Sequence, residues 1–458
     1  MNTDDLAWQA SNYGGLSPRK VDLLLERGHL DLVIGVAEER GEWFCAKGAA
    51  KELCRAGEFT GALKVMEPFV ATGWRTASWA KADILLQAGR TDKALDLIRP
   101  DEESRASQVV CRNRAELLAR AGRVDAAIDL LVPHIGESWI RTVLVDITEG
   151  QSRDEQVLEL IAPHAEAARR ARDEGRWDYS CSDAQELQAR VLERAGHIDE
   201  AIQVLGEDMA EDRYLTQNTV TAYAELLARH GRLDQLHELG IGKDARSVLH
   251  IYAGALRDLG RGEEAEVVMR DAIAADDWVG YRAWLSSALL RDGRLDDAIT
   301  VAEPGFSWYD CSNLLAPLVH LLLDQPEKLL HLLEHPLTVP HHGHEEFQHC
   351  WRAFALAGLG RVQEAITVVE THPDPWTDPR IARARLLSAA GHLAAAAAEL
   401  RGLGTIEARA ELFEVLVQQG QAAEAIAAHP TVAEQRAAEA KTVSVPLRED
   451  GYSLEPPF

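Results

Sequence analysis

Apolar residues recur along the chain in short blocks whose spacing matches one face of a helix. Ala115 and Leu118 lie seven and four residues before Gly122, and a second apolar block begins after it with Ala127 and Ile128. Offsets of three, four and seven residues place side chains on the same face of an α-helix. Each pair of blocks therefore predicts two helices that pack by their apolar faces, with the glycine between them.

The same frame recurs about every thirty residues, which is a period typical of helical repeat proteins. The recurring glycines are Gly28, Gly57, Gly89, Gly122, Gly196, Gly231, Gly260, Gly293, Gly360, Gly391 and Gly420. A leucine lies four residues before each of them, and an alanine usually lies five residues after. Such a period predicts a stack of small helical units, in which each unit buries its apolar face against its neighbours.

Each glycine suits the end of the first helix, because glycine adopts the left-handed conformation of a C′ residue without a Cβ penalty. A short polar residue usually follows three positions later, where it could cap the second helix. These expected N-caps are Asp31, Thr60, Asp92, Asp125, Asp199, Asp234 and Asp296. The predicted unit is thus helix A, a two-residue turn and helix B.

This frame resembles the tetratricopeptide repeat, whose small residue, leucine, glycine and alanine fall in the same register over residues 20–430. The resemblance implies an all-α fold, a right-handed α–α superhelix of about thirteen helical hairpins. An insertion is expected near residues 165–178 and a degenerate repeat near 305–340. The spacing of the glycines is shorter and more variable than in a strict tetratricopeptide array. Pentatricopeptide repeats share the glycine and alanine positions and are the alternative.

The domain organisation expected from the period is simple. Residues 1–19 form a lead-in, residues 20–440 form the solenoid, and residues 441–458 form an extended tail. The tail contains Pro446, Pro456 and Pro457 and shows no helical periodicity, which is typical of an extended chain terminus.

Composition narrows the classes of partner. The net charge of −26 disfavours nucleic acid, whose binding depends on neutralising phosphates with cations. No run of 18 apolar residues occurs, so no membrane span is expected. The six cysteines are scattered without metal-ligand spacing, which favours reduced thiols and a cytoplasmic protein.

Candidate binding residues come from the resemblance, which implies that helix A lines a concave groove. In that family, ligand contacts come from positions ten, six and two before the glycine, which share one helix face. Here these positions select Lys47, Lys51, Arg55, Trp79, Asp83, Gln87, Arg112, Glu116, Arg120, Glu186, Arg190 and Arg194. The predicted groove residues are Lys47, Lys51, Arg55, Trp79, Arg112, Arg120, Arg190 and Arg194.

Such a cluster of cations in an acidic protein predicts a basic groove for an acidic peptide or a C-terminal carboxylate. The alternative is structural. Arginines two residues before the glycine, such as Arg55, Arg120 and Arg194, would face water and complement the helix dipole.

A histidine-rich stretch between His335 and Cys350 is the weak candidate for a metal site. Glu345 and His349 are four residues apart and would share a helix face, with His344 beside them. No HExxH motif and no third ligand at a fixed spacing accompany them. No phosphate-binding loop, dinucleotide fingerprint or nucleophile elbow occurs either, so we expect no metal, no cofactor and no enzyme activity.

The sequence therefore predicts a non-enzymatic scaffold or regulator that binds a protein or peptide in its groove. Three alternatives stay open: a regulatory receptor that senses a peptide or small molecule, a metal-dependent enzyme that uses the His335–Cys350 region, and self-association. In the last case the acidic tail, which ends in the carboxylate of Phe458, would enter the basic groove of a neighbouring molecule.

Overall fold

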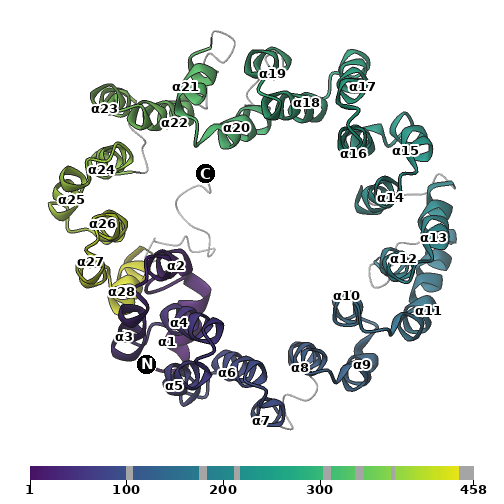
Figure 1. Cartoon of the computed structure of the whole chain (residues 1–458), viewed down its shortest axis with the longest axis horizontal. Coiled ribbons are helices and arrows are strands. Elements are labelled where there is room, and N and C mark those ends of the chain that lie inside the picture. Colours follow the sequence, from purple (N-terminus) through teal and green to yellow (C-terminus); the bar gives the residue numbers. More distant parts are fainter. Residues whose placement is uncertain are drawn as a thin grey trace, which may run out of the picture. The chain divides into compact units, whose positions relative to one another are not determined.

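The computed structural model describes residues 1–99, 107–174, 183–210, 217–302, 311–335, 345–372 and 377–442. Across these ranges every regular element is a helix, and consecutive helices pack as antiparallel hairpins (Figure 1). The all-α helical-repeat prediction is therefore confirmed. The chain divides into two compact units: unit 1 comprises Met1–Ile98 and Glu345–Phe458, and unit 2 comprises Arg99–His344.

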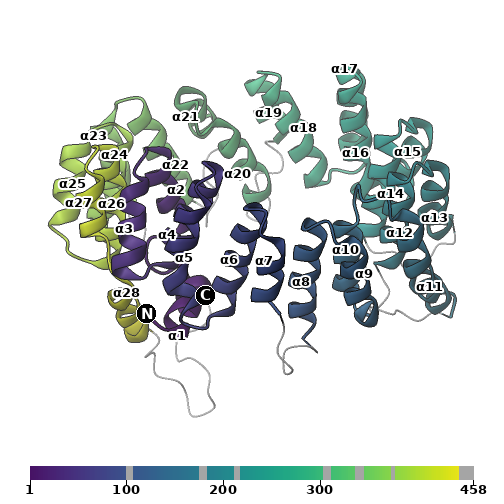
Figure 2. The same cartoon turned by 60° about the horizontal axis from the view of Figure 1, so that its bottom comes forward.

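Unit 1 contains helices from both ends of the chain. They are α1 (Thr3–Asn12), α2 (Pro18–Glu26), α3 (Leu30–Arg40), α4 (Trp43–Arg55), α5 (Phe59–Val70), α6 (Arg75–Gln87), α7 (Thr91–Leu97), α22 (Glu345–Gly358), α23 (Val362–Thr371), α24 (Pro379–Ala389), α25 (Leu393–Arg401), α26 (Ile406–Gln418), α27 (Ala422–Ala428) and α28 (Val432–Thr442). The helices α24, α25, α26 and α27 pack in sequence, each against the one before it, whereas α28 packs against α26 (Figure 2).

Unit 2 contains the helices of the middle of the chain. They are α8 (Gln108–Arg120), α9 (Val124–Leu131), a short 3₁₀ turn η2 (Val132–His134), α10 (Ser138–Ile147), α11 (Asp154–Asp173), α12 (Ala184–Arg194), α13 (Ile198–Ala210), α14 (Gln217–Arg229), α15 (Leu233–Gly240), α16 (Ala245–Asp258), α17 (Gly262–Ala275), α18 (Val279–Arg291), α19 (Leu295–Ala302), α20 (Cys311–Leu322) and α21 (Pro326–Glu334).

The turn inside each hairpin is built on the predicted glycine. Every glycine of the frame has a positive φ, between 64° and 86°. The residue after the glycine donates its backbone N–H to the carbonyl of the leucine that lies four residues before the glycine. Examples are the bonds from Glu58 to Leu53 and from Arg123 to Leu118, both at 2.8 Å. This is the Schellman arrangement. The leucine thus both closes the turn through its carbonyl and buries its side chain in the core.

The aspartates three residues after the glycine are not N-caps, so that prediction was wrong. In α7 the N-cap is Arg90, directly after Gly89, and no side chain caps the helix. The Schellman bond fixes the residue directly after the glycine, and this residue becomes the N-cap. Helix B therefore begins two residues after the glycine, earlier than predicted. Asp92 therefore lies inside the first turn of α7, where its carboxylate faces the positive end of the helix dipole.

One hydrophobic cluster runs through unit 1 and joins residues from both ends of the chain. It includes Leu16, Val21 and Leu24 together with Phe413 and Leu416. The alanines of the repeat frame in this cluster, such as those in α5, α25 and α27, have no exposed surface, so the paired helices approach closely. The first and last hairpins of the chain consequently share a core.

The expected domain bounds stay a prediction. The structure places α1 inside the lead-in 1–19, and α11 spans the first part of the insertion expected near 165–178. Residues 443–458 of the expected tail lie outside the described ranges. No helix in the described ranges is both long and apolar enough to cross a membrane.

Candidate functional site

Three predicted groove residues line one pocket of unit 1. Lys47, Lys51 and Arg55 line it from α4, and Asp83 and Gln87 face them from α6; the pocket has a volume of about 540 Å³. The cations are four residues apart, which is about one helical turn, so the helix places them in a row. The structure thus brings together the first three cations selected from the sequence.

The floor of this pocket is apolar. Ala50 and Cys54 contribute from α4, Met66 from α5, and Ala80 and Ile84 from α6. Met66 is fully buried. Burial raises the pKa of the Cys54 thiol, and the nearby Asp83 raises it further, so Cys54 behaves as a packing residue and not as a thiolate nucleophile. The site is an apolar slot with charged groups along its rim.

The rim of the pocket carries unneutralised positive charge. Arg55 forms an ion pair with Glu52 at 2.6 Å, and the amide of Gln87 donates to Asp83 at 2.9 Å. Lys47 and Lys51 are both exposed. The structure gives neither lysine an ion pair or a hydrogen bond to another described residue. Two free ammonium groups one turn apart therefore face the opening.

Trp79 does not belong to this pocket. It is half-buried on α6, but its neighbour Ala80 lines the slot in its place. On α8 in unit 2, Arg112 forms an ion pair with Glu116 at 2.8 Å, one turn along the helix. Arg120 is exposed near the end of α8. None of these three side chains lines the pockets described here.

Arg190 and Arg194 line a second pocket, in unit 2, between α12 and α14. Its volume is about 500 Å³, and Arg229 is its third cation. The carboxylates lining the same pocket are Glu149, Glu186, Glu193 and Glu225. Carboxylates thus outnumber the cations, and this pocket is not the basic groove that the sequence suggested.

Arg194 has a structural role. Its guanidinium forms an ion pair with Asp154 at 2.7 Å and donates to the carbonyl of Val145 at 2.5 Å and to the hydroxyl of Thr148 at 2.9 Å. These bonds link α12 to α10 and α11, and the Arg194 side chain is only 15% exposed. Arg194 therefore holds three helices together, and neither the helix dipole nor a ligand is needed to explain its position.

The other arginines of the second pocket are also neutralised by neighbouring helices. Arg190 forms an ion pair with Asp146 at 2.8 Å, and Arg229 forms two hydrogen bonds with Glu193, each at 2.9 Å. Burial raises the pKa of Glu186, with Asp183 and Glu225 adding like-charge repulsion. Sequence reasoning missed Asp146 as the partner of Arg190 and Glu193 as the partner of Arg229, because each comes from another helix and no periodic signal connects it to its arginine.

The histidine-rich stretch does not form a metal centre among the described residues. His344 lies outside the described ranges, and Glu345 begins α22. The ring of His349 stacks on that of His372, with centroids 3.6 Å apart. No group of three potential ligand side chains gathers within the described ranges.

Comparison with known proteins places the repeat in a family. The sequence profile of the tetratricopeptide repeat matches residues 76–100 and 108–132, which cover the hairpins α6–α7 and α8–α9. These two segments have the predicted glycine, leucine and alanine frame. This part of the chain is a tetratricopeptide-like helical repeat.

Solved structures of other helical repeat proteins are similar to this tetratricopeptide-like chain at low identity. The Naa15/Naa10 complex bound to HypK-THB is 15% identical, with a TM-score of 0.34, over 84% of this chain and 67% of that chain. The pentatricopeptide repeat protein PPR10 from maize is 14% identical, with a TM-score of 0.37, over 93% of this chain and 63% of that chain. PPR10 has also been solved in complex with an 18-nt psaJ RNA element.

A third similar structure is the APC/C hetero-tetramer Cut9–Hcn1, which is 12% identical, with a TM-score of 0.25, over 93% of this chain and 92% of that chain. The tetratricopeptide-like chain spans less than two thirds of the length of PPR10. No curated protein sequence matches it.

Proposed function

We propose that this protein binds an acidic segment of another protein in the pocket of Lys47, Lys51 and Arg55, and that it acts as a non-enzymatic scaffold or regulator. The observation that carries the proposal is the pair of exposed lysines without a carboxylate partner. The chain has a net charge of −26, and most of the arginines named in the two pockets form an ion pair with a neighbouring carboxylate. A carboxylate from a partner would form charge-assisted hydrogen bonds with this pair, which are about twice as strong as neutral ones.

The apolar floor adds a second requirement for the partner. Ala50, Met66 and Ile84 offer a slot for an aliphatic side chain, and burying one would stabilise the complex by about 1.5–3 kcal/mol. We therefore favour a peptide that combines acidic and aliphatic residues. The net charge of the chain argues against a polynucleotide partner, because most of its surface would repel phosphates.

The proposal of a non-catalytic role is supported by the chemistry of the described pockets. The thiol of Cys54 is protonated because burial raises its pKa, and helical repeat scaffolds typically present binding surfaces and not reaction centres. A cytoplasmic location agrees with the reduced thiols of Cys45 and Cys54. Self-association through the tail stays a prediction, since residues 443–458 lie outside the described ranges.

The test is a charge reversal in the pocket. A fluorescein-labelled peptide of alternating Glu and Leu serves as the probe, and binding is followed by fluorescence anisotropy. The double variant Lys47→Glu/Lys51→Glu should abolish binding without changing the helical circular dichroism, and binding by the unaltered protein should weaken with added salt.

The matched control is Lys64→Glu/Lys93→Glu, which makes the same change in net charge at lysines outside the pocket. This control should bind the probe nearly as well as the unaltered protein. Equal binding by the pocket variant and the control variant would refute the proposal, as would equal affinity for a Gln/Leu peptide.

A further inference from the structure

The two ends of the chain are joined by a polar junction inside unit 1. From α2, the ammonium of Lys20 donates to the carbonyl of Ala410 at 2.9 Å, and the guanidinium of Arg27 donates to the carbonyl of Val417 at 3.1 Å. Both bonds join residues that are 390 positions apart in the sequence. The helix α2 therefore lies against α26.

A second part of the junction joins α1 to α28. The indole N–H of Trp8 donates to the carboxylate of Glu439 at 2.7 Å, and Arg436 forms an ion pair with Asp5. The guanidinium of Arg436 also lies over the ring of Trp8, 5.7 Å from its centroid. Together with the contacts of α2, these bonds define the end junction: Asp5, Trp8, Gly15, Lys20 and Arg27 facing Ala410, Val417, Gln435, Arg436 and Glu439.

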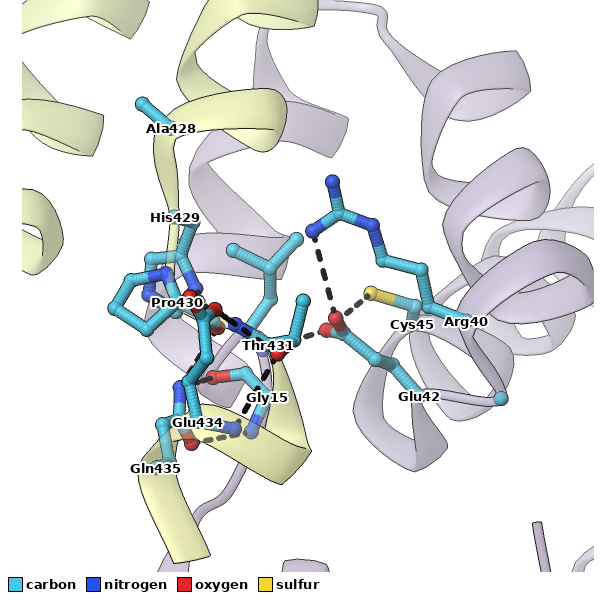
Figure 3. Close-up of polar contacts among 12 residues, drawn as sticks. Gly15, Arg40, Glu42, Cys45, Ala428, His429, Pro430, Thr431, Glu434 and Gln435 are labelled. Carbon is cyan, nitrogen blue, oxygen red and sulfur yellow. Dashed lines mark hydrogen bonds and ion pairs between the residues drawn. The ribbon is translucent and has the colours of Figure 1, made fainter. Parts of the chain in front are cut away.

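The segment before α2 is held from two sides (Figure 3). The backbone N–H of Gly15 donates to the side chain of Gln435 in α28 at 2.8 Å. The next backbone N–H, that of Leu16, donates to the carboxylate of Glu42 at 2.7 Å. Glu42 is the N-cap residue of α4 and is 1% exposed. Consecutive amides thus connect α28, the last helix of the described residues, to the start of the helix that carries the lysine pair.

The opposite face of α2 packs directly behind that lysine pair. Gly48 lies between Lys47 and Lys51 in α4, and a Cβ on it would come within 2.5 Å of a methyl group of Val21 and 3.3 Å of one of Leu25. Only a glycine allows α2 and α4 to approach this closely. The position of α2 therefore sets the position of the backbone that presents the two ammonium groups.

We propose that the end junction controls the Lys47–Lys51 pocket by holding α2 against α4. This inference rests on the proposed function for its binding effect, but its mechanical part does not. The helix α2 is nine residues long, which is too short to be stable alone in water. It keeps its place because α3 and α4 pack on it, α26 bonds to Lys20 and Arg27, and α28 bonds to the segment before it, so loss of the junction would loosen it. By linkage, a ligand in the pocket would in turn tighten the junction.

The experiment opens the junction without touching the pocket or the core. The triple variant Arg27→Ala/Gln435→Ala/Arg436→Ala removes side chains that bridge α2 and its preceding segment to α26 and α28. Arg19→Ala is the control, because Arg19 is exposed on α2 and forms no hydrogen bond or ion pair with the described part of the C-terminal helices. Both full-length variants are followed by hydrogen–deuterium exchange and by anisotropy with the Glu/Leu probe.

In the triple variant, exchange should rise about tenfold or more in α2, in α26 and in α4, as expected for a local opening that has become easier. Probe affinity should fall about fivefold, at the low end of ordinary coupling between sites. The control should match the unaltered protein in both measurements. Faster exchange in α2 and α26 with unchanged exchange in α4 would overturn the inference, and so would unchanged exchange in α2.

The two proposals fail in distinguishable ways. If the unaltered protein does not bind the probe, the proposed function fails, while exchange in α4 still decides whether the junction holds this helix. If the unaltered protein binds the probe and the triple variant binds it equally well despite faster exchange in α4, control of the pocket is refuted and the proposed function survives.

Discussion

The ammonium of Lys20 lies 3.2 Å from Nε2 of His429, across 409 residues of sequence. The other ring nitrogen of His429 lies 3.0 Å from the carbonyl of Pro430, to which it donates, so Nε2 is left as the acceptor. Burial, and then the charge of Lys20, lowers the pKa of His429 to about 3. Burial also lowers the pKa of Lys20, although Glu414 and Glu411 partly offset it. The pair is a neutral, buried imidazole held by a half-buried cation.

The first prediction concerns pH. Because the folded pKa of His429 lies below its unfolded value of 6.5, the unfolded chain binds a proton that the folded chain does not. The free energy of unfolding should therefore fall as pH drops below 6.5, by up to about 1.4 kcal/mol per pH unit from this group. Urea unfolding at pH 7 and pH 5 measures it. His429→Gln should reduce the difference between the two pH values, and an unchanged difference would contradict the assignment.

The second prediction separates two glycines of one hairpin. Gly28 has a φ of +79°, and a Cβ would meet nothing within 4 Å at either Gly28 or Gly35. Gly28→Ala should destabilise the protein by about 1 kcal/mol, because alanine is strained in the left-handed region. Gly35 lies inside α3, so Gly35→Ala should stabilise the protein by about 0.5 kcal/mol. Urea midpoints compare the two variants, and a shift in the same direction would count against the turn mechanism.

The third prediction concerns the structural arginine. Arg194→Ala should lower the free energy of unfolding by about 2 kcal/mol, since Asp154 and the buried hydroxyl of Thr148 lose a charged donor. Arg190→Ala, four residues earlier on the exposed face, should change it by about 0.5 kcal/mol or less. Neither variant should alter binding of the Glu/Leu probe. Loss of probe binding in Arg194→Ala at unchanged stability would reverse this assignment.

The fourth prediction tests the close contact behind the lysine pair. Gly48→Ala places a methyl group 2.5 Å from Val21, so α2 should shift and its amides should exchange faster with solvent. Overpacking of this kind costs about 1–3 kcal/mol. Gly61→Ala in α5 is the matched change, because its Cβ would lie 3.5 Å from Leu53 in ordinary contact. Equal exchange of α2 in both variants would show that the contact is not limiting.

Sequence patterns predicted what is local and repeated. The glycine and leucine offsets predicted the hairpins because a helix end and its turn depend on residues within one or two turns, and the structure confirms a positive φ at each of these glycines. The expected aspartate caps were wrong by a short distance, since a pattern of offsets does not show where the hydrogen bonds of the turn end. Lys47, Lys51 and Arg55 were placed together because they lie on one helix.

What lies between distant helices could not be predicted in this way. The partners of Arg194 come from two earlier helices, and Gln435 bonds to Gly15, which lies 420 residues before it. Nothing in a repeat period encodes such a pairing, because each residue type also occurs at exposed positions. The free lysine pair likewise stands out only after the carboxylates near the other cations are known.

The end junction has a consequence for biosynthesis. When α2 leaves the ribosome, the helix that will cover it lies 390 residues further along the chain, and at usual rates of translation about 20–80 s pass before that helix is made. During this interval the side of α2 that carries Lys20 and Arg27 lacks its final neighbour. The nascent N-terminal hairpin is therefore the segment for which a chaperone that shields apolar helices would matter most.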